Sequence, residues 1–187
     1  MPSRSDRTPV LLSAFALALL MAATRFHHFG SALNLPDASV AVFFLAGFLL
    51  SWWWFPAFAL FAAGIDYAAI AGAGASGYCV TPAYAFLLPT YAVMTFAGRW
   101  ARRHRALGLA DFAPLAAAAV LAAAVAFVVS NGSFYLFSNY FASLSYADYL
   151  VRTGRYAIPY ISWTLFYVAA GLAVVKFAPR LRAVARA

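Results

Sequence analysis

The sequence is poor in charged residues. Only 10% of its 187 residues are Asp, Glu, Lys or Arg, whereas a soluble globular domain has roughly a quarter. The hydrophobic fraction is 66% and the mean hydropathy is +0.82. A surface with so little charge would not stay dissolved in water, and a disordered chain has far fewer apolar residues. The composition therefore indicates a membrane protein.

Cysteine and lysine are almost absent. Cys79 is the only cysteine, so no disulfide can form within the chain and a small disulfide scaffold is excluded. Lys176 is the only lysine, and no G-x-x-x-x-G-K-[ST] segment occurs, so the chain has no P-loop ATP site. The segment 131–133, Asn-Gly-Ser, lacks the G-x-S-x-G context of a serine hydrolase.

Six apolar stretches are present, some of them short. A membrane helix needs about 20 mostly apolar residues, with roughly 17 to 25 tolerated. The alanine-rich composition of these stretches favours helices. We predict an all-α integral membrane bundle of six transmembrane helices, forming a single domain over residues 1–187. The predicted spans are 9–24, 38–54, 57–75, 82–98, 112–130 and 156–177.

Basic residues are distributed unevenly between the segments that join these spans. With the N-terminus inside, ten fall on inner segments and three on outer ones. The inner ones are Arg4, Arg7, Arg99, Arg102, Arg103, Arg105, Lys176, Arg180, Arg182 and Arg186, and the outer ones are Arg25, Arg152 and Arg155. This bias predicts that both termini are cytoplasmic. The net charge of +8 is then a topology signal and a contact for anionic lipid rather than for nucleic acid.

The outer loops are rich in aromatic and hydrogen-bonding residues. They cover 25–37, 72–82 and 131–155, and all three meet at one end of the predicted bundle. This arrangement predicts a pocket that opens outward for a sizeable ligand, partly apolar and partly polar. The third loop is predicted to lie on the membrane surface or to fold over the bundle as a lid, and an interfacial aromatic belt is the alternative.

Asp66 lies near the middle of the third predicted span. A carboxylate at that depth normally faces the protein interior and has a partner. It is a candidate for a ligand contact at the pocket floor, or for an ion pair with an arginine such as Arg152. The alternative is a buried carboxylate satisfied by neighbouring hydroxyls, without ligand contact.

Cys79 and two adjacent histidines stand in the outer loops. A lone cysteine is by default a small apolar filler. Cys79, however, lies in a glycine-rich loop just before a predicted helix start, where the helix N-terminus lowers a thiol pKa. One thiolate can act as an axial ligand to a metal whose other positions a macrocycle fills. His27 and His28 are candidates for ligand contact or are simply interfacial histidines.

Small residues recur at every fourth position of the first span, at Ala14, Ala18 and Ala22. This spacing lets another helix approach closely. The partner is either a helix of this chain or a separate membrane subunit.

Four segments are similar to those of a known family. They read Thr-Arg-Phe-His-His-Phe-Gly at 24–30, Leu-Pro-Asp-Ala-Ser at 35–39, Gly-Ile-Asp-Tyr at 64–67 and Gly-Tyr-Cys-Val-Thr-Pro-Ala-Tyr at 77–84. With six short helices in about 20.1 kDa, the chain resembles the S-components of energy-coupling-factor (ECF) transporters. More narrowly, it resembles the BtuM family of vitamin B12 S-components, over essentially its whole length.

The resemblance implies vitamin B12 (cobalamin) uptake across the bacterial inner membrane by a multi-pass protein. It implies capture from the periplasmic side, with a loop cysteine, here Cys79, as axial ligand to cobalt. It also implies a coupling subunit and two ATPases, which would dock at Ala14, Ala18 and Ala22. Binding of the thiolate to cobalt would help to expel an upper ligand, so Cys79-dependent decyanation of cyanocobalamin is a further hypothesis.

The cobalamin-binding candidates combine the residues of the pocket with the resemblance. They are Cys79, Asp66, Tyr84, Arg152, His28, Tyr78 and Arg155. Tyrosine faces pack on a flat corrin ring, and arginines suit its phosphate or amides. Three alternatives remain: an S-component for another vitamin with an inert Cys79, a membrane enzyme that uses Cys79 with His27 or His28, and a purely structural subunit.

Overall fold

The computed structural model describes residues 4–25 and 35–178, and within these ranges every regular element is a helix. The α-helices are α1 (Arg4–Arg25), α2 (Ser39–Leu49), α3 (Trp54–Ala73), α4 (Leu87–Ala101), α5 (Leu109–Phe137), α6 (Tyr146–Gly154) and α7 (Ala157–Phe177). Three short 3-10 helices, η2 (Gly77–Cys79), η3 (Pro82–Phe86) and η4 (Arg102–His104), lie between them. The prediction of an all-α membrane protein is confirmed at this level.

Four helices of the described chain are long and apolar enough to cross a membrane. They are α1 from Thr8 onward, α3, α5 and α7. The other two helices in predicted spans are shorter, since α2 has 11 residues and α4 has 15. At about 1.5 Å per residue, α2 is only about half the thickness of a bilayer core.

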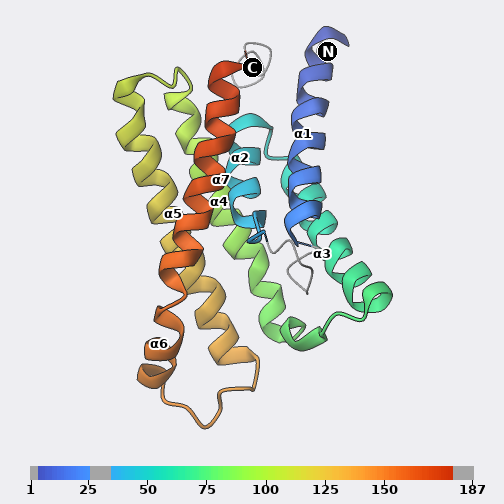
Figure 1. Ribbon diagram of the computed structural model, residues 1–187, viewed down its shortest axis with the longest axis vertical. Coiled ribbons are helices and arrows are strands. Elements are labelled where there is room, and N and C mark those ends of the chain that lie inside the picture. The colour runs from blue at the N-terminus through green and yellow to red at the C-terminus, as the bar shows by residue number, and fades with distance from the viewer. Residues whose placement is uncertain (1–3, 26–34, 179–187) are drawn as a thin grey trace.

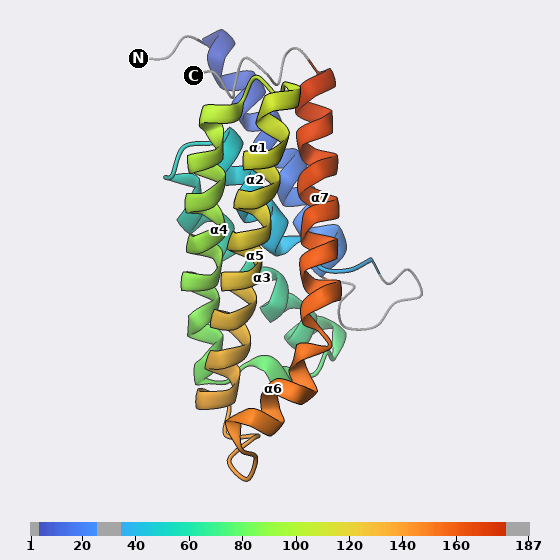
Figure 2. The ribbon, with the colours of Figure 1, turned by 90° about the vertical axis from the view of Figure 1, so that its left-hand side faces the viewer.

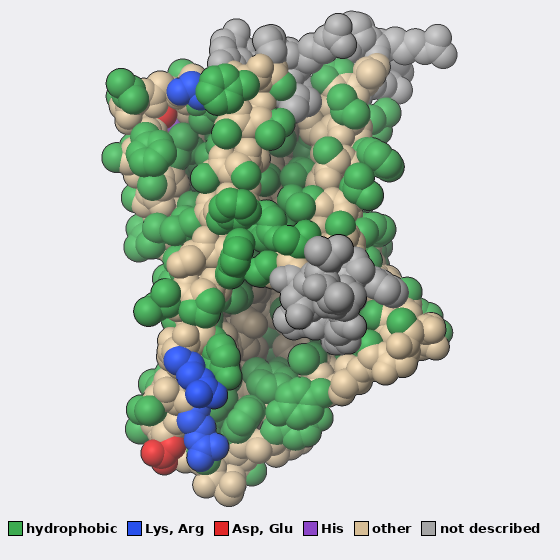
Figure 3. Space-filling model, in the orientation of Figure 1, with side chains coloured by type: hydrophobic (Ala, Val, Ile, Leu, Met, Phe, Trp, Pro, Cys, Tyr) green, Lys and Arg blue, Asp and Glu red, His purple; other side chains and the backbone are tan. Residues whose placement is uncertain are grey.

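Helices α1 to α5 run alternately down and up in one bundle, and α7 runs up again after the short α6 at the lower end (Figures 1 and 2). The start of α1 and the end of α7 lie at the same end of the molecule, together with the α4–α5 connection (Figure 1). Hydrophobic side chains cover most of the face in Figure 3, and large ones such as Phe15, Leu60 and Val151 are exposed. Such a surface is suited to lipid rather than to water.

The centre of the bundle is the short helix α2. All of its residues except Val40 are buried, and it contacts α1, α3, α4, α5 and α7. A helix that is apolar on every side is typical of such a position. Because its neighbours surround it, α2 contributes core rather than lipid-facing surface.

The predicted second span, 38–54, is too long at its end. The helix stops at Leu49, and Leu50 is extended with φ −109° and ψ 170°. The next helix starts at Trp54, the last residue of the predicted span, and Pro56 lies in the first turn of this helix, α3. Proline is tolerated there because the missing N–H has no partner within a first helical turn.

The predicted third outer loop, 131–155, is largely helical. Helix α5 continues through Gly132 to Phe137, since one helical glycine costs only about 1 kcal/mol. Ser145 then caps α6, because its Oγ accepts a hydrogen bond of 3.2 Å from the amide of Asp148. The predicted end of the fifth span at residue 130 is therefore too early by seven residues, and much of the predicted outer segment is helix.

The small-residue stripe of α1 faces the inside of the bundle in part. Ala14 is buried, while Ala18 and Ala22 are half-buried and pack against the core. Ala14 and Ala18 also line an apolar groove of about 320 Å³ between α1 and α3. Internal packing therefore accounts for part of the stripe.

Helices α2 and α4 approach each other through two glycines. A Cβ at Gly47 would lie 2.1 Å from the carbonyl oxygen of Thr95, and one at Gly98 would lie 1.9 Å from that of Phe44. Both obstacles are backbone atoms, so no side chain can rotate away. The contact therefore requires glycine at both positions.

Replacing Gly98 with alanine should force α2 and α4 apart. We expect Gly98→Ala to lower the free energy of unfolding by about 1–3 kcal/mol through overpacking, measured as a lower thermal unfolding midpoint in detergent. Gly64→Ala on α3 is the matched control, because a Cβ there meets nothing within 4 Å. Equal midpoints for the two variants would contradict the close α2–α4 contact.

Candidate functional site

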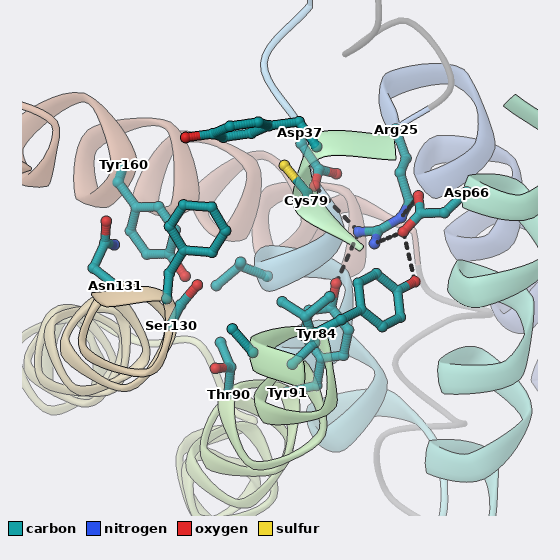
Figure 4. A pocket seen from close by; sticks show the side chains of 15 residues that line it. Arg25, Asp37, Asp66, Cys79, Tyr84, Thr90, Tyr91, Ser130, Asn131 and Tyr160 are labelled. Atoms are coloured by element: carbon teal, nitrogen blue, oxygen red, sulfur yellow. Dashed lines mark hydrogen bonds and ion pairs between the residues drawn. The ribbon is translucent and has the colours of Figure 1, made fainter. Parts of the chain in front are cut away.

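A cavity of about 320 Å³ is lined by Arg25 at the end of α1 and by residues of η2 and η3. Every other α-helix except α6 also contributes side chains to the lining, some of which Figure 4 labels. The lining residues are Arg25, Asp37, Val40, Asp66, Tyr78, Cys79, Ala83, Tyr84, Leu87, Thr90, Tyr91, Ser130, Asn131, Phe134 and Tyr160. Segments far apart in the sequence thus meet at one site.

Arg25, the last residue of α1, is the centre of the charged wall. Its side chain is only 8% exposed, yet its guanidinium has several partners. Nε donates to Oδ1 of Asp66 at 2.7 Å, and Nη2 donates to Oδ2 at 2.6 Å. This two-pronged geometry is the strong form of an arginine–carboxylate pair. The buried carboxylate in the third helix therefore has its counter-ion in α1.

The prediction that Asp66 pairs with an arginine is confirmed, but the partner is Arg25 and not the suggested Arg152. Arg152 lies on α6 and is exposed, whereas Asp66 is 7% exposed and bound to Arg25. Asp66 also accepts a hydrogen bond of 2.7 Å from the hydroxyl of Tyr84 (Figure 4). The pair is thus held from two sides, which fixes the carboxylate at the cavity wall.

The remaining arginine nitrogen, Nη1, ties α1 to α2 and α4. It donates to Oη of Tyr91 at 2.8 Å, to Oγ of Ser39 at 3.1 Å and to Oδ2 of Asp37 at 3.4 Å. Asp37 in turn accepts hydrogen bonds from the amide and the hydroxyl of Ser39, at the start of α2. The described wall therefore holds one cation and two carboxylates, an excess of one negative charge.

Cys79 lines the same cavity as this cluster. It is the last residue of η2, whose first turn is capped by Ser76, and its side chain is accessible to solvent. Partial burial, and next the negative charge of Asp66, raise the pKa of the Cys79 thiol above its ordinary value, although Arg25 opposes them. The pKa is thus raised rather than lowered as expected, with desolvation as the largest cause.

Aromatic rings surround the η2 side of the cavity. Tyr78 stacks on Tyr140 of the α5–α6 connection, with ring centroids 4.3 Å apart and planes at 9°. Phe134 of α5 lies 5.8 Å from the same Tyr78 ring. These rings join η2 to the last turns of α5, so the cavity is bounded there by apolar faces.

The wall opposite the charged cluster is neutral. It is formed by Ser130 and Asn131 of α5 and by Tyr160 of α7 (Figure 4). Two hydrogen bonds hold Asn131 in place. Its side-chain Nδ2 donates to the backbone carbonyl of Phe127 at 3.0 Å, and its backbone carbonyl accepts from the hydroxyl of Tyr149 at 2.9 Å. The cavity thus has one charged and one uncharged polar side.

The predicted site residues divide into three groups. Asp66, Tyr78, Cys79 and Tyr84 line the cavity. Arg152 and Arg155 are exposed on or beside α6 and do not line it, and Arg155 binds the hydroxyl of Tyr156 at 3.0 Å. His28, like His27, lies outside the described residues.

Sequence reasoning missed Arg25, Asp37, Asn131 and Tyr160. For Arg25 a signal existed, because it is the basic residue that directly follows the first span, while Asp66 is the only carboxylate inside a predicted span. Opposite charges at the depth of a membrane are each other's natural partners. For Asn131 and Tyr160 no comparable signal exists, since both are ordinary polar residues near predicted helix ends.

Within residues 4–25 and 35–178, no three His, Cys, Asp or Glu side chains come together to hold a metal ion. A metal ion bound by the Cys79 thiolate would therefore need its other ligands from the bound molecule and not from these side chains. Neither the protein-family models nor the curated sequences compared with the chain give a significant match.

Replacing one member of the Arg25–Asp66 pair should destabilise the protein more than replacing both. We expect Arg25→Met or Asp66→Asn alone to lower the free energy of unfolding by about 3–5 kcal/mol. The first leaves Asp66 without its counter-ion, and the second leaves Arg25 only its longer ion pair with Asp37, at 3.4 Å. The double variant should recover much of this loss, since Asp37 remains partly solvated. Additive losses in a double-mutant cycle of thermal unfolding in detergent would argue against the pair.

Alkylation of Cys79 should follow its raised pKa. Because the thiolate is the reactive form, we expect iodoacetamide to react more slowly than with free cysteine at neutral pH and to accelerate as the pH rises. Asp66→Asn removes a charge that raises this pKa, so its profile should move to lower pH. Asp148→Asn, on exposed α6, should leave it unchanged. As the chain has one cysteine, label uptake measures this site alone, and identical profiles for the three proteins would refute the coupling.

Proposed function

We propose that this protein captures a corrinoid of the vitamin B12 type at the outer face of a bacterial inner membrane, as the substrate-binding subunit of a transporter. The observation that carries the proposal is that one cavity holds both the single thiol, Cys79, and the buried Arg25–Asp66–Tyr84 cluster. The thiol supplies a ligand for cobalt, and the cluster supplies fixed polar contacts beside it.

The charge of the cavity supports a cationic metal centre. Among the described lining residues, Arg25 is outnumbered by Asp37 and Asp66. Cobalt(III) in a corrin is positively charged and already has four equatorial nitrogens, so one axial thiolate suffices. An anionic ligand would instead meet an excess of negative charge in a poorly solvated site.

The cavity as observed has room for only a part of a corrinoid. Its volume of about 320 Å³ lies at the lower end of the roughly 300–1,000 Å³ typical of drug-sized ligands, and a corrinoid with a nucleotide tail is larger. We expect the cobalt face to enter beside Cys79, with the Tyr78–Tyr140 stack separating to admit the ring. Tyrosine faces then pack on the corrin.

Cyanocobalamin would react at this site by exchange of ligands. The Cys79 thiol loses its proton, its sulfur forms a bond to cobalt, and the cobalt–cyanide bond breaks. Cyanide leaves with that proton as hydrogen cyanide, so the exchange balances without any oxidant or reductant. The raised thiol pKa makes the step faster as the pH rises.

The transport role rests on topology and packing. The proposed arrangement has six passes, with α2 and with η3–α4 as the short ones, and both termini cytoplasmic. Arg99, Arg102, Arg103 and Arg105 then lie on the inner side, and the cavity opens outward. The α1–α3 groove at Ala14 and Ala18 is the proposed docking face for an ECF coupling subunit, whose ATPases supply the ATP hydrolysis.

The test is the visible absorption spectrum of detergent-purified protein after incubation with cyanocobalamin and thorough desalting. We expect the wild type to retain the corrinoid with shifted bands, because cobalt exchanges cyanide for sulfur. Cys79→Ala should retain far less and show no shift, at an unchanged thermal unfolding midpoint.

Two results would contradict the proposal in different ways. A colourless wild type would discard the corrinoid and favour another vitamin. Equal band shifts in the wild type and in Cys79→Ala would remove the thiol from the site while leaving the corrinoid in place.

A further inference from the structure

One buried polar atom at the cavity has no hydrogen-bond partner among the described residues. Among the described residues, two buried side-chain nitrogen or oxygen atoms lack a hydrogen bond, Nε of Arg102 and the hydroxyl oxygen of Tyr160. Of these two residues only Tyr160 lines the cavity. Leaving a buried hydroxyl unsatisfied costs about 1–3 kcal/mol, so its retention there calls for an explanation.

The other half-buried or buried tyrosines near this end differ from Tyr160. Each of their hydroxyls has a protein partner in the described chain. These are Tyr84 with Asp66, Tyr91 with Arg25, Tyr135 with the carbonyl of Leu144, and Tyr149 with the carbonyl of Asn131. The hydroxyl of Tyr160 is thus the one in this group that is left to bind something else.

The ring of Tyr160 is held rather than free to turn away. It packs edge-on against Phe127 of α5, with centroids 5.3 Å apart and planes at 65°. Figure 4 shows Tyr160 on the side of the cavity opposite Arg25 and Asp66, together with Asn131. The side-chain nitrogen Nδ2 of Asn131 already donates a hydrogen bond to the backbone carbonyl of Phe127. The side-chain oxygen of Asn131 therefore remains as an acceptor on the same wall.

We infer that Tyr160 and Asn131 form a subsite for a primary carboxamide of the bound ligand. The Tyr160 hydroxyl donates to the carboxamide oxygen, and the carboxamide NH₂ donates to the Asn131 side-chain oxygen. A carboxylate would not suit this wall, since it lacks a cation and faces the excess negative charge of the opposite wall. The inference rests on the proposed function, because the corrin ring is edged with such amides.

The test compares Tyr160→Phe with the wild type by titration with cyanocobalamin in detergent. Loss of one ligand hydrogen bond should weaken binding roughly 3- to 10-fold. The thermal unfolding midpoint without ligand should stay equal or rise, because the variant removes an unsatisfied hydroxyl. A purely structural tyrosine would show the reverse pattern.

Tyr135→Phe is the matched control. Its hydroxyl binds Leu144 and it does not line the cavity, so the variant should lower the unfolding midpoint and leave affinity unchanged. The separated monocarboxylate isomers of cyanocobalamin identify the amide. One isomer should bind the wild type more weakly than cyanocobalamin does, and Tyr160→Phe should reduce that difference.

The outcomes separate this inference from the function on which it rests. Binding of cyanocobalamin by the wild type with unchanged affinity in Tyr160→Phe would overturn the subsite and leave the proposed function standing. A wild type that binds no cobalamin would overturn both. If Tyr160→Phe weakens binding and also lowers the thermal unfolding midpoint, Tyr160 has a structural role and the subsite is rejected.

Discussion

The ion pair between Arg25 and Asp66 is the interaction on which the site depends. Both side chains are almost completely buried between apolar helices, where an unpaired charge is very unfavourable. Together with Asp37, Ser39, Tyr84 and Tyr91, the pair joins α1, α3, η3, α4 and the start of α2. These partners fix one wall of the cavity in a single geometry, so its polar atoms are arranged before any ligand arrives.

The central helix explains how so many elements reach this cluster. Helix α2 is short and buried, and the glycine contacts at Gly47 and Gly98 bring α4 against it. Tyr91 of α4 stacks on Phe43 of α2 with centroids 4.1 Å apart, and its hydroxyl accepts from Arg25. Close helix packing in the core therefore positions a hydrogen-bond partner at the site. The opposite wall, from α5 and α7, is neutral, and the buried hydroxyl of Tyr160 on it has no hydrogen-bond partner among the described residues.

Much of the fold could be predicted from the sequence, because apolar length alone determines where helices form. The helix ends could not, since they depend on packing: the chain continues α5 through Gly132 and starts α3 before Pro56. The site was predictable where chemistry stands out locally, as at Asp66 and Cys79. The partner of Asp66 was missed, because Arg25 is 41 residues away and only its place directly after the first predicted span set it apart from the other outer arginines. The thiol pKa was also missed, since partial burial and the nearby Asp66 are visible only in three dimensions.

Together these features describe a pocket with a fixed charged wall, a neutral polar wall and a thiol whose pKa is raised by partial burial. The central claim is that this thiol becomes a ligand of corrin-bound cobalt. Cobalt K-edge X-ray absorption of the purified complex formed with cobalamin tests it most directly, because it identifies the atoms bound to the metal. We expect one sulfur in the coordination shell of cobalt in the wild type and none in Cys79→Ala. A shell of nitrogen, oxygen or carbon alone in the wild-type complex would contradict it.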